Sequence, residues 1–425
     1  ALYSLLSERM AASSLEEKAL ATLAANLGSQ AFLLRSCLEV SEAEAQGHLR
    51  VSVIRKCWPV VVVKPLTVEE VSACVTCAAN LGIPVSVVGG AHSAFCAGGR
   101  IILDLEHFQS VDVNVETQLV TAGGGATARQ IQQGAQLHGL AVPLGTAPTV
   151  GAGLLLQGGI GHLSRRCGLS LDSVVAARIV VADGSCITAS AKENGDIFWA
   201  LRGYGPNFGV VVSLTMRAFN AYPFMVLRQT FAISGGSSPP GLPDGAKLLQ
   251  EYACLAAGLP RVVSADCLIF FNGDGQMQLD VHEYHEQEVP GASEVNSRVG
   301  AKLSATSTIE EHPERLSLVQ LFDREPYLLE QPLGTLLLAG PLGLGFYVRA
   351  VFLASPMEQL VADLLINSMT AAPCGHCHIH LQHAGGAVGD TLPNDTAFSA
   401  RGLEWSAVLA GCWPKPDEGG MEDRC

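Results

Sequence analysis

Three loops of this chain are unusually rich in glycine. They are Gly89-Gly90-Ala91-His92-Ser93, residues 145–151, and Gly158-Gly159-Ile160-Gly161. Glycine lets backbone N–H groups approach a bound pyrophosphate closely, as dinucleotide binding requires. The usual G-x-G-x-x-G fingerprint is absent, because Gly203-x-Gly205-x-x-x-Gly209 misses its spacing. Each loop alone is typical of a tight turn, so only the three together indicate a cofactor site.

A row of alternating polar residues indicates a second site. If residues 376–383 form a strand, His378, His380 and Gln382 share one face, together with His376. The opposite face would carry Cys377, Ile379, Leu381 and His383, and its apolar members should pack against helices. A buried polar face needs partners that a substrate could supply, whereas the face of an exposed edge strand would be solvated. His380 is the preferred general base, because imidazole titrates near neutral pH.

Two C-x-x-C pairs were considered as metal or haem sites. Cys374-Gly375-His376-Cys377-His378 matches the c-type haem signature, but no helical domain of haem size surrounds it. Cys74 and Cys77 lie on the apolar face of a helix predicted over residues 67–81, which is typical of core cysteines. We therefore expect no metal site.

The glycine loops follow short apolar strands. Residues 60–63 are four valines between prolines, and Thr67 begins a helix with a capping box at Glu70 and a stop at Gly82. We expect an N-terminal helical segment over residues 1–54, an α+β domain over 55–221 and a second domain over 222–425. In the second domain, predicted helices alternate with strands of a sheet, at residues 245–255, 263–271, 345–353, 357–369 and 376–383.

Composition excludes several functions. The 425 residues are 48% hydrophobic and 16% charged, as in globular proteins. A net charge of −14 argues against nucleic-acid binding. No apolar run is long enough to span a membrane. Thirteen cysteines without a framework favour reduced thiols inside a cell, although a removed leader peptide would leave the same sequence.

In this order, the motifs resemble the FAD-binding domain of the p-cresol methylhydroxylase and vanillyl-alcohol oxidase superfamily. The most similar branch is that of berberine bridge enzyme and 6-hydroxynicotine oxidase. The resemblance runs from Trp58 to Phe219 and includes Val181-Ala182-Asp183-Gly184 and Asn207-Phe208-Gly209-Val210. A weaker match continues from Gly385 to Trp413. It implies an α+β fold with a two-part FAD-binding domain of the PCMH type and a substrate domain whose antiparallel sheet is covered by helices.

The resemblance implies FAD held covalently through His92. Relatives that make a second bond use a cysteine where this chain has Ala147, so a single bond is expected. Val150 matches a position beside the flavin that controls oxygen access, and a small residue there is similar to the oxidases. The residues expected to bind the cofactor are Gly89, Gly90, Ala91, His92, Ser93, Thr149, Val150, Gly153, Gly158, Gly159, Gly161, Asn207 and Gly209.

The implied activity is oxidation of a small alcohol, sugar or amine by hydride transfer to flavin N5, with O2 as the expected acceptor. Substrate would bind between the flavin and the second domain's sheet, with His380, Gln382 and His378 as catalytic residues. The catalytic glutamate of plant relatives would fall near Val408, and Ala94 stands where some relatives carry a tyrosine. The relatives' tyrosine-rich C-terminal segment is not present either, because it was cut away or because this protein manages without it. These departures favour an alternative, a flavin-binding protein without redox turnover that serves as a carrier or cyclase.

Overall fold

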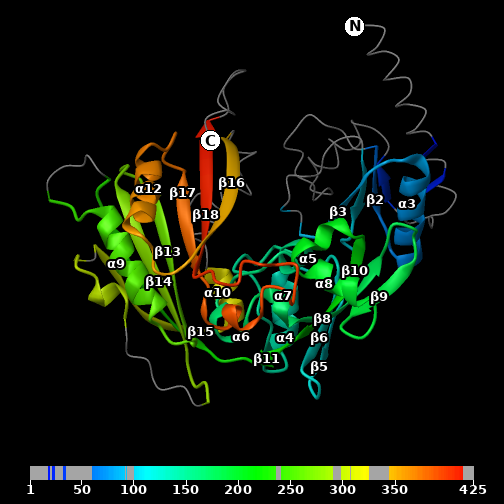
Figure 1. Cartoon of the computed structure of the whole chain (residues 1–425), viewed down its shortest axis with the longest axis horizontal. Helices are drawn as coiled ribbons and strands as arrows, with labels where there is room; N and C mark the ends of the chain where they lie inside the picture. The colour runs from blue at the N-terminus through cyan, green and yellow to red at the C-terminus, as the bar shows by residue number, and fades with distance from the viewer. Residues whose placement is uncertain are drawn as a thin grey trace, which may run out of the picture. The chain divides into compact units, whose positions relative to one another are not determined.

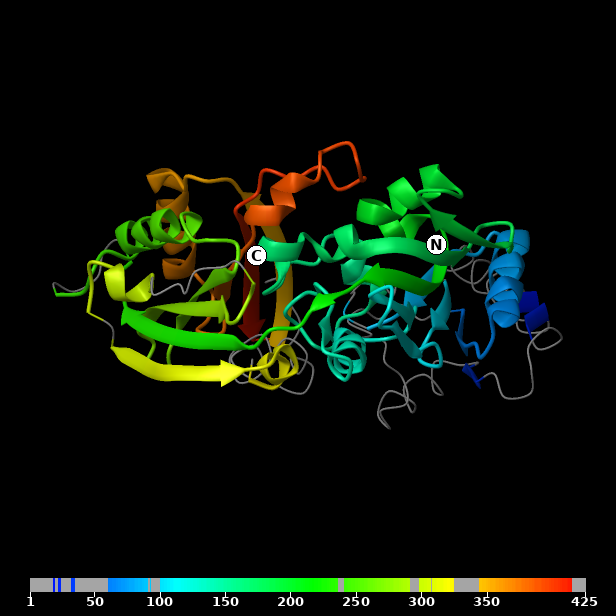
Figure 2. The same cartoon turned by 90° about the horizontal axis from the view of Figure 1, so that it is seen from below.

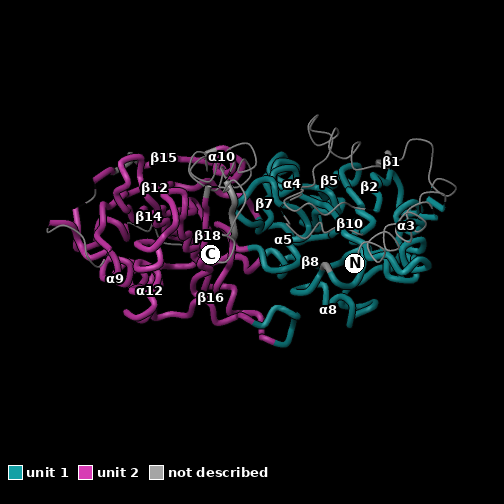
Figure 3. Tube along the Cα trace, turned by 90° about the horizontal axis from the view of Figure 1, so that it is seen from above, with its two compact units in different colours: residues 1–159, 170–219, 394–399 teal, residues 160–169, 220–393, 400–425 magenta. Residues whose placement is uncertain are grey.

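The computed structural model describes residues 18–19, 22–23, 32–34, 60–90, 92, 100–235, 241–290, 298–306, 308–324 and 344–414. By its contacts the chain divides into two compact units (Figure 3). Unit 1 comprises residues 1–159, 170–219 and 394–399, and unit 2 comprises residues 160–169, 220–393 and 400–425. The domain boundaries expected at residues 54 and 221 stay predictions.

Unit 1 begins with a small sheet in the order β1-β2-β4-β3. Its strands are β1 (Phe32–Leu34), β2 (Val61–Lys64), β3 (Val85–Val88) and β4 (Ile101–Asp104). β2, β4 and β3 are parallel, and β1 is antiparallel to β2. Residues 32–34 therefore form a strand where a helical segment was expected, because pairing with β2 overrides the local helical pattern.

Helix α3 (Val68–Leu81) has the predicted ends. The Thr67 side chain accepts a hydrogen bond from the Glu70 N–H, and Gly82 closes the helix with a φ of 65°, which favours glycine. Cys74 and Cys77 are buried in the cluster that α3 forms with the small sheet, as expected for core cysteines. The helix thus fixes the strand that leads into Gly89 and Gly90.

The second part of unit 1 is an antiparallel sheet in the order β5-β6-β10-β8-β9. Its strands are β5 (Val111–Asn114), β6 (Leu119–Gly123), β8 (Val174–Val180), β9 (Cys186–Ser190) and β10 (Val210–Arg217). Around it lie α4 (Ala128–Gln136), β7 (Leu140–Ala141), α5 (Ala152–Leu155), α7 (Ser170–Ser173), α8 (Gly195–Tyr204) and the 3-10 turn η1 (Gly205–Asn207). The Thr127–Gln130 capping box begins α4. β11 (Phe219–Asn220) leads into unit 2.

Unit 2 is built on an antiparallel sheet in the order β15-β12-β14-β13-β17-β18-β16 (Figure 1). The strands are β12 (Phe224–Ala232), β13 (Val263–Phe271), β14 (Met277–Glu286), β15 (Ile309–Leu316), β16 (Leu344–Leu353), β17 (His378–His383) and β18 (Trp405–Pro414). The helical elements are α6 (Ser164–Cys167), α9 (Gly245–Ala257), η2 (Gly300–Lys302), α10 (Leu318–Arg324), α12 (Gln359–Thr370) and η4 (Gly386–Asp390). The expected α+β class with a helix-covered antiparallel sheet is confirmed.

The sheet of unit 2 has two chemically different faces. Helices α9 and α12 cover one face (Figure 2), and Ile379 and Leu381 of β17 lie in the apolar cluster beneath them, as predicted. Strand register places His378 and His380 on the opposite face, beside Ala410 and Val408 of β18. The strand begins two residues later than predicted.

The expected alignment of His376 with this face is wrong. Residues 374–377 form a turn before β17, closed by a 3.2 Å hydrogen bond from the Cys377 N–H to the Cys374 carbonyl. His376 is consequently exposed rather than part of the strand. The glycine at position 375, which breaks the strand pattern, is the residue that favours this turn.

Replacing Ile379 by Ala should leave a cavity between β17 and the two helices. We expect the free energy of unfolding to fall by about 2–4 kcal/mol, measured by denaturant titration. Leu364→Ala on α12 is the matched control, because this leucine is 61% exposed and its loss should cost less than about 0.5 kcal/mol. Equal effects of the two substitutions would contradict the assignment of the buried face.

Candidate functional site

Two of the predicted glycine loops meet in unit 1, backbone against backbone. A Cβ atom on Gly90 would lie 2.6 Å from both the Gly151 nitrogen and the Thr149 oxygen. A Cβ on Gly151 would lie 2.7 Å from the Gly90 nitrogen. Real Cβ atoms do not approach other atoms so closely, so the contact requires glycine on both sides.

This contact brings His92 to the second loop. His92 Nε2 lies 2.8 Å from Thr149 Oγ1, although 57 positions separate the two residues. Both residues are exposed. Desolvation by neighbouring atoms nevertheless lowers the pKa of His92, and the contact with Thr149 opposes that shift. A lowered pKa keeps the imidazole neutral, which is the form that can act as a nucleophile.

The first residues of helix α4 hydrogen-bond to the second glycine loop, residues 145–151. The N–H groups of Ala128 and Arg129 donate to the carbonyls of Val150 and Pro148 at 2.8 and 2.9 Å. α5 begins directly after Gly151, and the first amides of a helix have no partner within that helix. Gly153, in its first turn, is exposed with no atom within 4 Å of an added Cβ. Such amides suit a phosphate group.

Three more of the predicted glycines have a backbone φ in the positive range. Gly159 has a φ of 78°, and its carbonyl accepts both the N–H and the hydroxyl of Ser170 at 3.0 Å. Gly209 has a φ of 148°, with the Val180 oxygen 2.3 Å from an added Cβ. Gly158 likewise has a φ of 144°. All three conformations favour glycine.

For several other residues predicted to bind the cofactor, the structure gives no contact that bears on this role. Asn207 is exposed, and Val150 is buried. Gly161 belongs to unit 2, where its N–H donates to Ser164 Oγ at 2.9 Å. Ala91 and Ser93 lie outside the described residues. A cofactor role for these positions stays a prediction.

In unit 2, His378 and His380 are buried on the polar face of the sheet. His380 Nε2 lies 3.4 Å from Asp266 Oδ2 of β13. Within the described residues, His378 Nε2, His380 Nε2 and Ser264 Oγ are buried without a hydrogen-bond partner. Burial lowers the pKa of His378 to about 4, and the neighbouring His380 lowers it further, so His378 is neutral at pH 7. Gln382 is partly buried.

Sequence reasoning missed the acidic residues that accompany these histidines. Asp280 accepts hydrogen bonds from Thr230 and Arg228 and lies 3.0 Å from His282. Burial would raise the pKa of Asp266, but His380 outweighs it and the pKa lies below its usual range. No local signal in the sequence marks Asp266, because the alternating set to which it belongs continues with the apolar Leu268 and Phe270.

Glu286 is a second acidic group on this sheet with an altered pKa. Burial raises the pKa of Glu286 to about 7, against the attraction of Arg166, with which it forms a short contact. The rings of His162 and Tyr284 are in contact, tilted by 41°, with centroids 4.0 Å apart. The segment before and within α6 therefore contributes His162 and Arg166 to the polar side of unit 2.

Part of unit 1 is similar in sequence to known FAD-binding proteins. Residues 59–190 match the family model described as "FAD binding domain". A xylooligosaccharide oxidase of Thermothelomyces thermophilus is 39% identical over 172 residues, which are 39% of this chain and 35% of that protein. Residues 59–190 form an FAD binding domain. The predicted resemblance is thereby confirmed, with FAD as the cofactor.

Two further comparisons extend over most of the chain. An FAD-linked oxidoreductase of Dictyostelium discoideum is 26% identical over 365 residues, covering 85% of this chain and 75% of that protein. The solved structure of BBE-like 1 from Physcomitrella patens aligns with a TM-score of 0.74 at 20% identity, covering 93% and 84% of the two chains. At this identity the structure shows a shared fold. The match to the xylooligosaccharide oxidase spans only about a third of its length.

The described residues include no helix that is long and apolar enough to cross a membrane. They also contain no group of three histidine, cysteine or acidic side chains that could hold a metal ion. Unit 1 thus offers backbone amides and one exposed histidine, and unit 2 by itself offers a buried polar sheet face.

Replacing Gly90 by Ala should separate the two glycine loops, because the added methyl group meets fixed backbone atoms. We expect a loss of about 1–3 kcal/mol in unfolding free energy and a lower FAD content, measured from the ratio of flavin to protein absorbance. Gly195→Ala is the matched control, since nothing lies within 4 Å of its Cβ. Normal FAD content in Gly90→Ala would contradict the role of this contact.

Proposed function

We propose that this chain is an FAD-dependent oxidoreductase that oxidises a small organic substrate, with His380 as the general base. The observation that supports this most is the pair formed by His380 and Asp266, 3.4 Å apart and buried on the polar face of unit 2. Val408, near which the catalytic glutamate of plant relatives would fall, lies directly opposite His380 in the register of β17 and β18. A base is thus available on the neighbouring strand.

The cofactor is proposed to be attached to His92. Its ring nitrogen Nε2 lies 2.8 Å from Thr149 Oγ1, which orients the imidazole beside the second glycine loop. The exposed position and lowered pKa of His92 suit this role. Gly89, Gly90 and the first turn of α5 provide the backbone that binds the rest of the molecule.

In the proposed reaction, His380 accepts a proton from a substrate hydroxyl or amine. The Asp266 carboxylate, 3.4 Å from His380 Nε2, would stabilise the resulting imidazolium by its charge. His378, which stays neutral, can donate or accept a hydrogen bond to the substrate, and Gln382 can orient it. FAD, held by the glycine loops of unit 1, would supply the hydride acceptor for this oxidation.

The proposed substrate class is an alcohol, sugar or amine, and the proposed electron acceptor is O2. A sugar is supported by the relative named xylooligosaccharide oxidase and by another named chitooligosaccharide oxidase. Hydrogen-bonding groups on one sheet face suit a hydroxyl-rich molecule. O2 is supported by the small Val150, and release of hydrogen peroxide would test it.

His92→Ala should abolish covalent attachment, so that acid-denatured protein loses its flavin to the supernatant. The measurement is flavin fluorescence of the protein band on a denaturing gel. His138→Ala, at an exposed histidine on the same unit, should keep a fluorescent band. A fluorescent band in His92→Ala would show that another residue carries the bond.

His380→Ala should slow flavin reduction by about 10²-fold or more if His380 is the base, with FAD content unchanged. Asp266→Asn should slow it by a smaller factor, because it removes only the charge that supports the imidazolium. The measurement is anaerobic stopped-flow bleaching of the flavin with a panel of xylo-oligosaccharides, chito-oligosaccharides, alcohols and amines. His376→Ala, in the exposed turn before β17, is the matched control and should react like the unmodified protein.

The same experiment distinguishes an oxidoreductase from a flavin-binding protein without redox turnover. If no member of the panel bleaches the unmodified protein, a flavin-binding protein without redox turnover is favoured, as the valine at position 408 would suggest. If bleaching is fast in both the unmodified protein and His380→Ala, the chain is an oxidoreductase with another base. Glu286 would then be tested next, because its pKa of about 7 suits proton transfer.

A further inference from the structure

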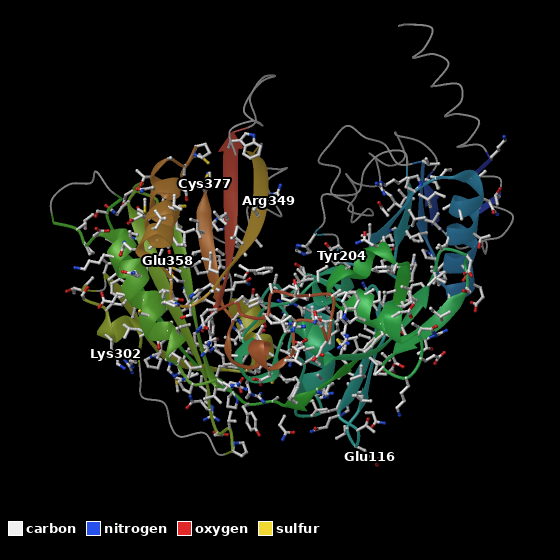
Figure 4. All side chains as sticks on the ribbon, viewed as in Figure 1. Glu116, Tyr204, Lys302, Arg349, Glu358 and Cys377 are labelled. Carbon is white, nitrogen blue, oxygen red and sulfur yellow. The ribbon has the colours of Figure 1, made fainter. Side chains whose placement is uncertain are left out.

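Three cysteines of unit 2 lie together where β17 begins. Cys374 and Cys377 are the ends of the turn before β17, and Cys412 lies on the paired strand β18. Figure 4 labels Cys377 at this end of the strand. The turn is closed by the hydrogen bond from the Cys377 N–H to the Cys374 carbonyl. The ends of such a turn lie less than about 7 Å apart between Cα atoms, which overlaps the range that a disulfide spans.

The two thiols of the turn converge on one atom. Cys374 Sγ lies 2.9 Å and Cys377 Sγ lies 3.3 Å from the Cys412 carbonyl oxygen. The Cys412 N–H in turn donates to Cys377 Sγ at 3.2 Å. Both sulfur atoms therefore point to the same side of the turn. Short backbone separation and converging side chains are the two geometric conditions for a disulfide.

We propose that Cys374 and Cys377 form a reversible intramolecular disulfide by exchange with a low-molecular-weight disulfide such as oxidised glutathione. Cys374 is partly exposed and Cys377 is 4% exposed, so Cys374 attacks first. Its thiolate displaces one glutathione thiolate and forms a mixed disulfide. The Cys377 thiolate then attacks Cys374 Sγ and releases the second glutathione. Protein is oxidised by two electrons, the small disulfide is reduced to two thiols, and the two protein protons go to them.

Other roles for this motif fit the structure less well. A c-type haem would need both sulfurs and the His378 ring accessible, but Cys377 and His378 are 4% and 2% exposed. The described residues offer no group of three ligands for a metal ion here. A dithiol with two converging sulfurs accounts for the C-x-x-C spacing without any added group.

The exchange should be slow at neutral pH. Burial, together with the neighbouring Cys377, raises the pKa of the Cys374 thiol above its ordinary value. Because the thiolate is the attacking form, the initial rate should rise about tenfold per pH unit from pH 7 towards pH 9. The disulfide would form next to the strand that carries His378 and His380, but the proposal does not depend on the proposed function.

The test uses the full chain as purified. It is incubated with oxidised glutathione, the remaining thiols are alkylated, and the peptides are mapped by mass spectrometry with and without dithiothreitol. We expect a linked Cys374–Cys377 peptide two hydrogens lighter than the dithiol and restored by dithiothreitol. Cys186 and Cys254, which are exposed, serve as internal controls for simple glutathione adducts. A lasting adduct on Cys374 with Cys377 alkylated, or a bond from Cys377 to Cys412, would overturn the proposal.

Serine variants of single cysteines distinguish loss of the disulfide from failure of the protein to fold. Cys374→Ser, at the partly exposed position, should abolish the linked peptide, and Cys377→Ser should leave a stable glutathione adduct on Cys374. Cys254→Ser should leave the intramolecular bond unchanged. If Cys377→Ser does not fold, the outcome with Cys374→Ser and the pH dependence of the unmodified chain still decide between a dithiol couple and two independent thiols.

Discussion

The buried guanidinium of Arg165 is the interaction on which the arrangement of unit 2 depends. It donates to the carbonyls of Val263, Leu259 and Ala384 at 2.7–2.8 Å and to the Glu404 carboxylate at 2.8 Å. Burial lowers the pKa of Arg165, but Glu404 opposes the shift. A buried charge is tolerated only with such complete pairing. The side chain thereby fixes residues 160–169 to the sheet, including His162 and Arg166.

The same network determines the state of His383 at the end of β17. Its Nδ1 accepts the Ala265 N–H at 3.0 Å, and its Nε2 lies 3.0 Å from the Glu404 carboxylate and 2.8 Å from the Arg165 guanidinium. Burial lowers the pKa of His383 to about 4, so the ring is neutral, and it stacks on Trp405. His383 therefore holds one end of the strand, while His380 faces the other side. One strand thus serves a structural and a proposed catalytic role on opposite faces.

Local signals in the sequence predicted the features that depend on local physics. Thr67, Glu70 and Gly82 gave the ends of α3, and period-two alternation gave the apolar face of Ile379 and Leu381. Features made by distant pairing were not predictable in this way. The strand Phe32–Leu34 depends on β2, and Asp266 reaches His380 only through the pairing of β13 with β17. The three glycine loops indicate a cofactor site only by their order along the chain. The spacing of glycines within any one loop is equally typical of a tight turn.

The polar face of the unit 2 sheet carries buried charges and buried polar atoms that differ in how well they are paired. Asp266, Asp280 and Glu286 are buried, and each has a basic neighbour in His380, Arg228 or Arg166. Charge is thus largely balanced, yet His378 Nε2 and Ser264 Oγ lack partners within the described residues. An unsatisfied buried polar atom costs about 1–3 kcal/mol, and apolar side chains in these positions would avoid that cost. The proposed substrate site would offset this cost, because a bound hydroxyl or amine could complete the hydrogen bonds of His378 and Ser264.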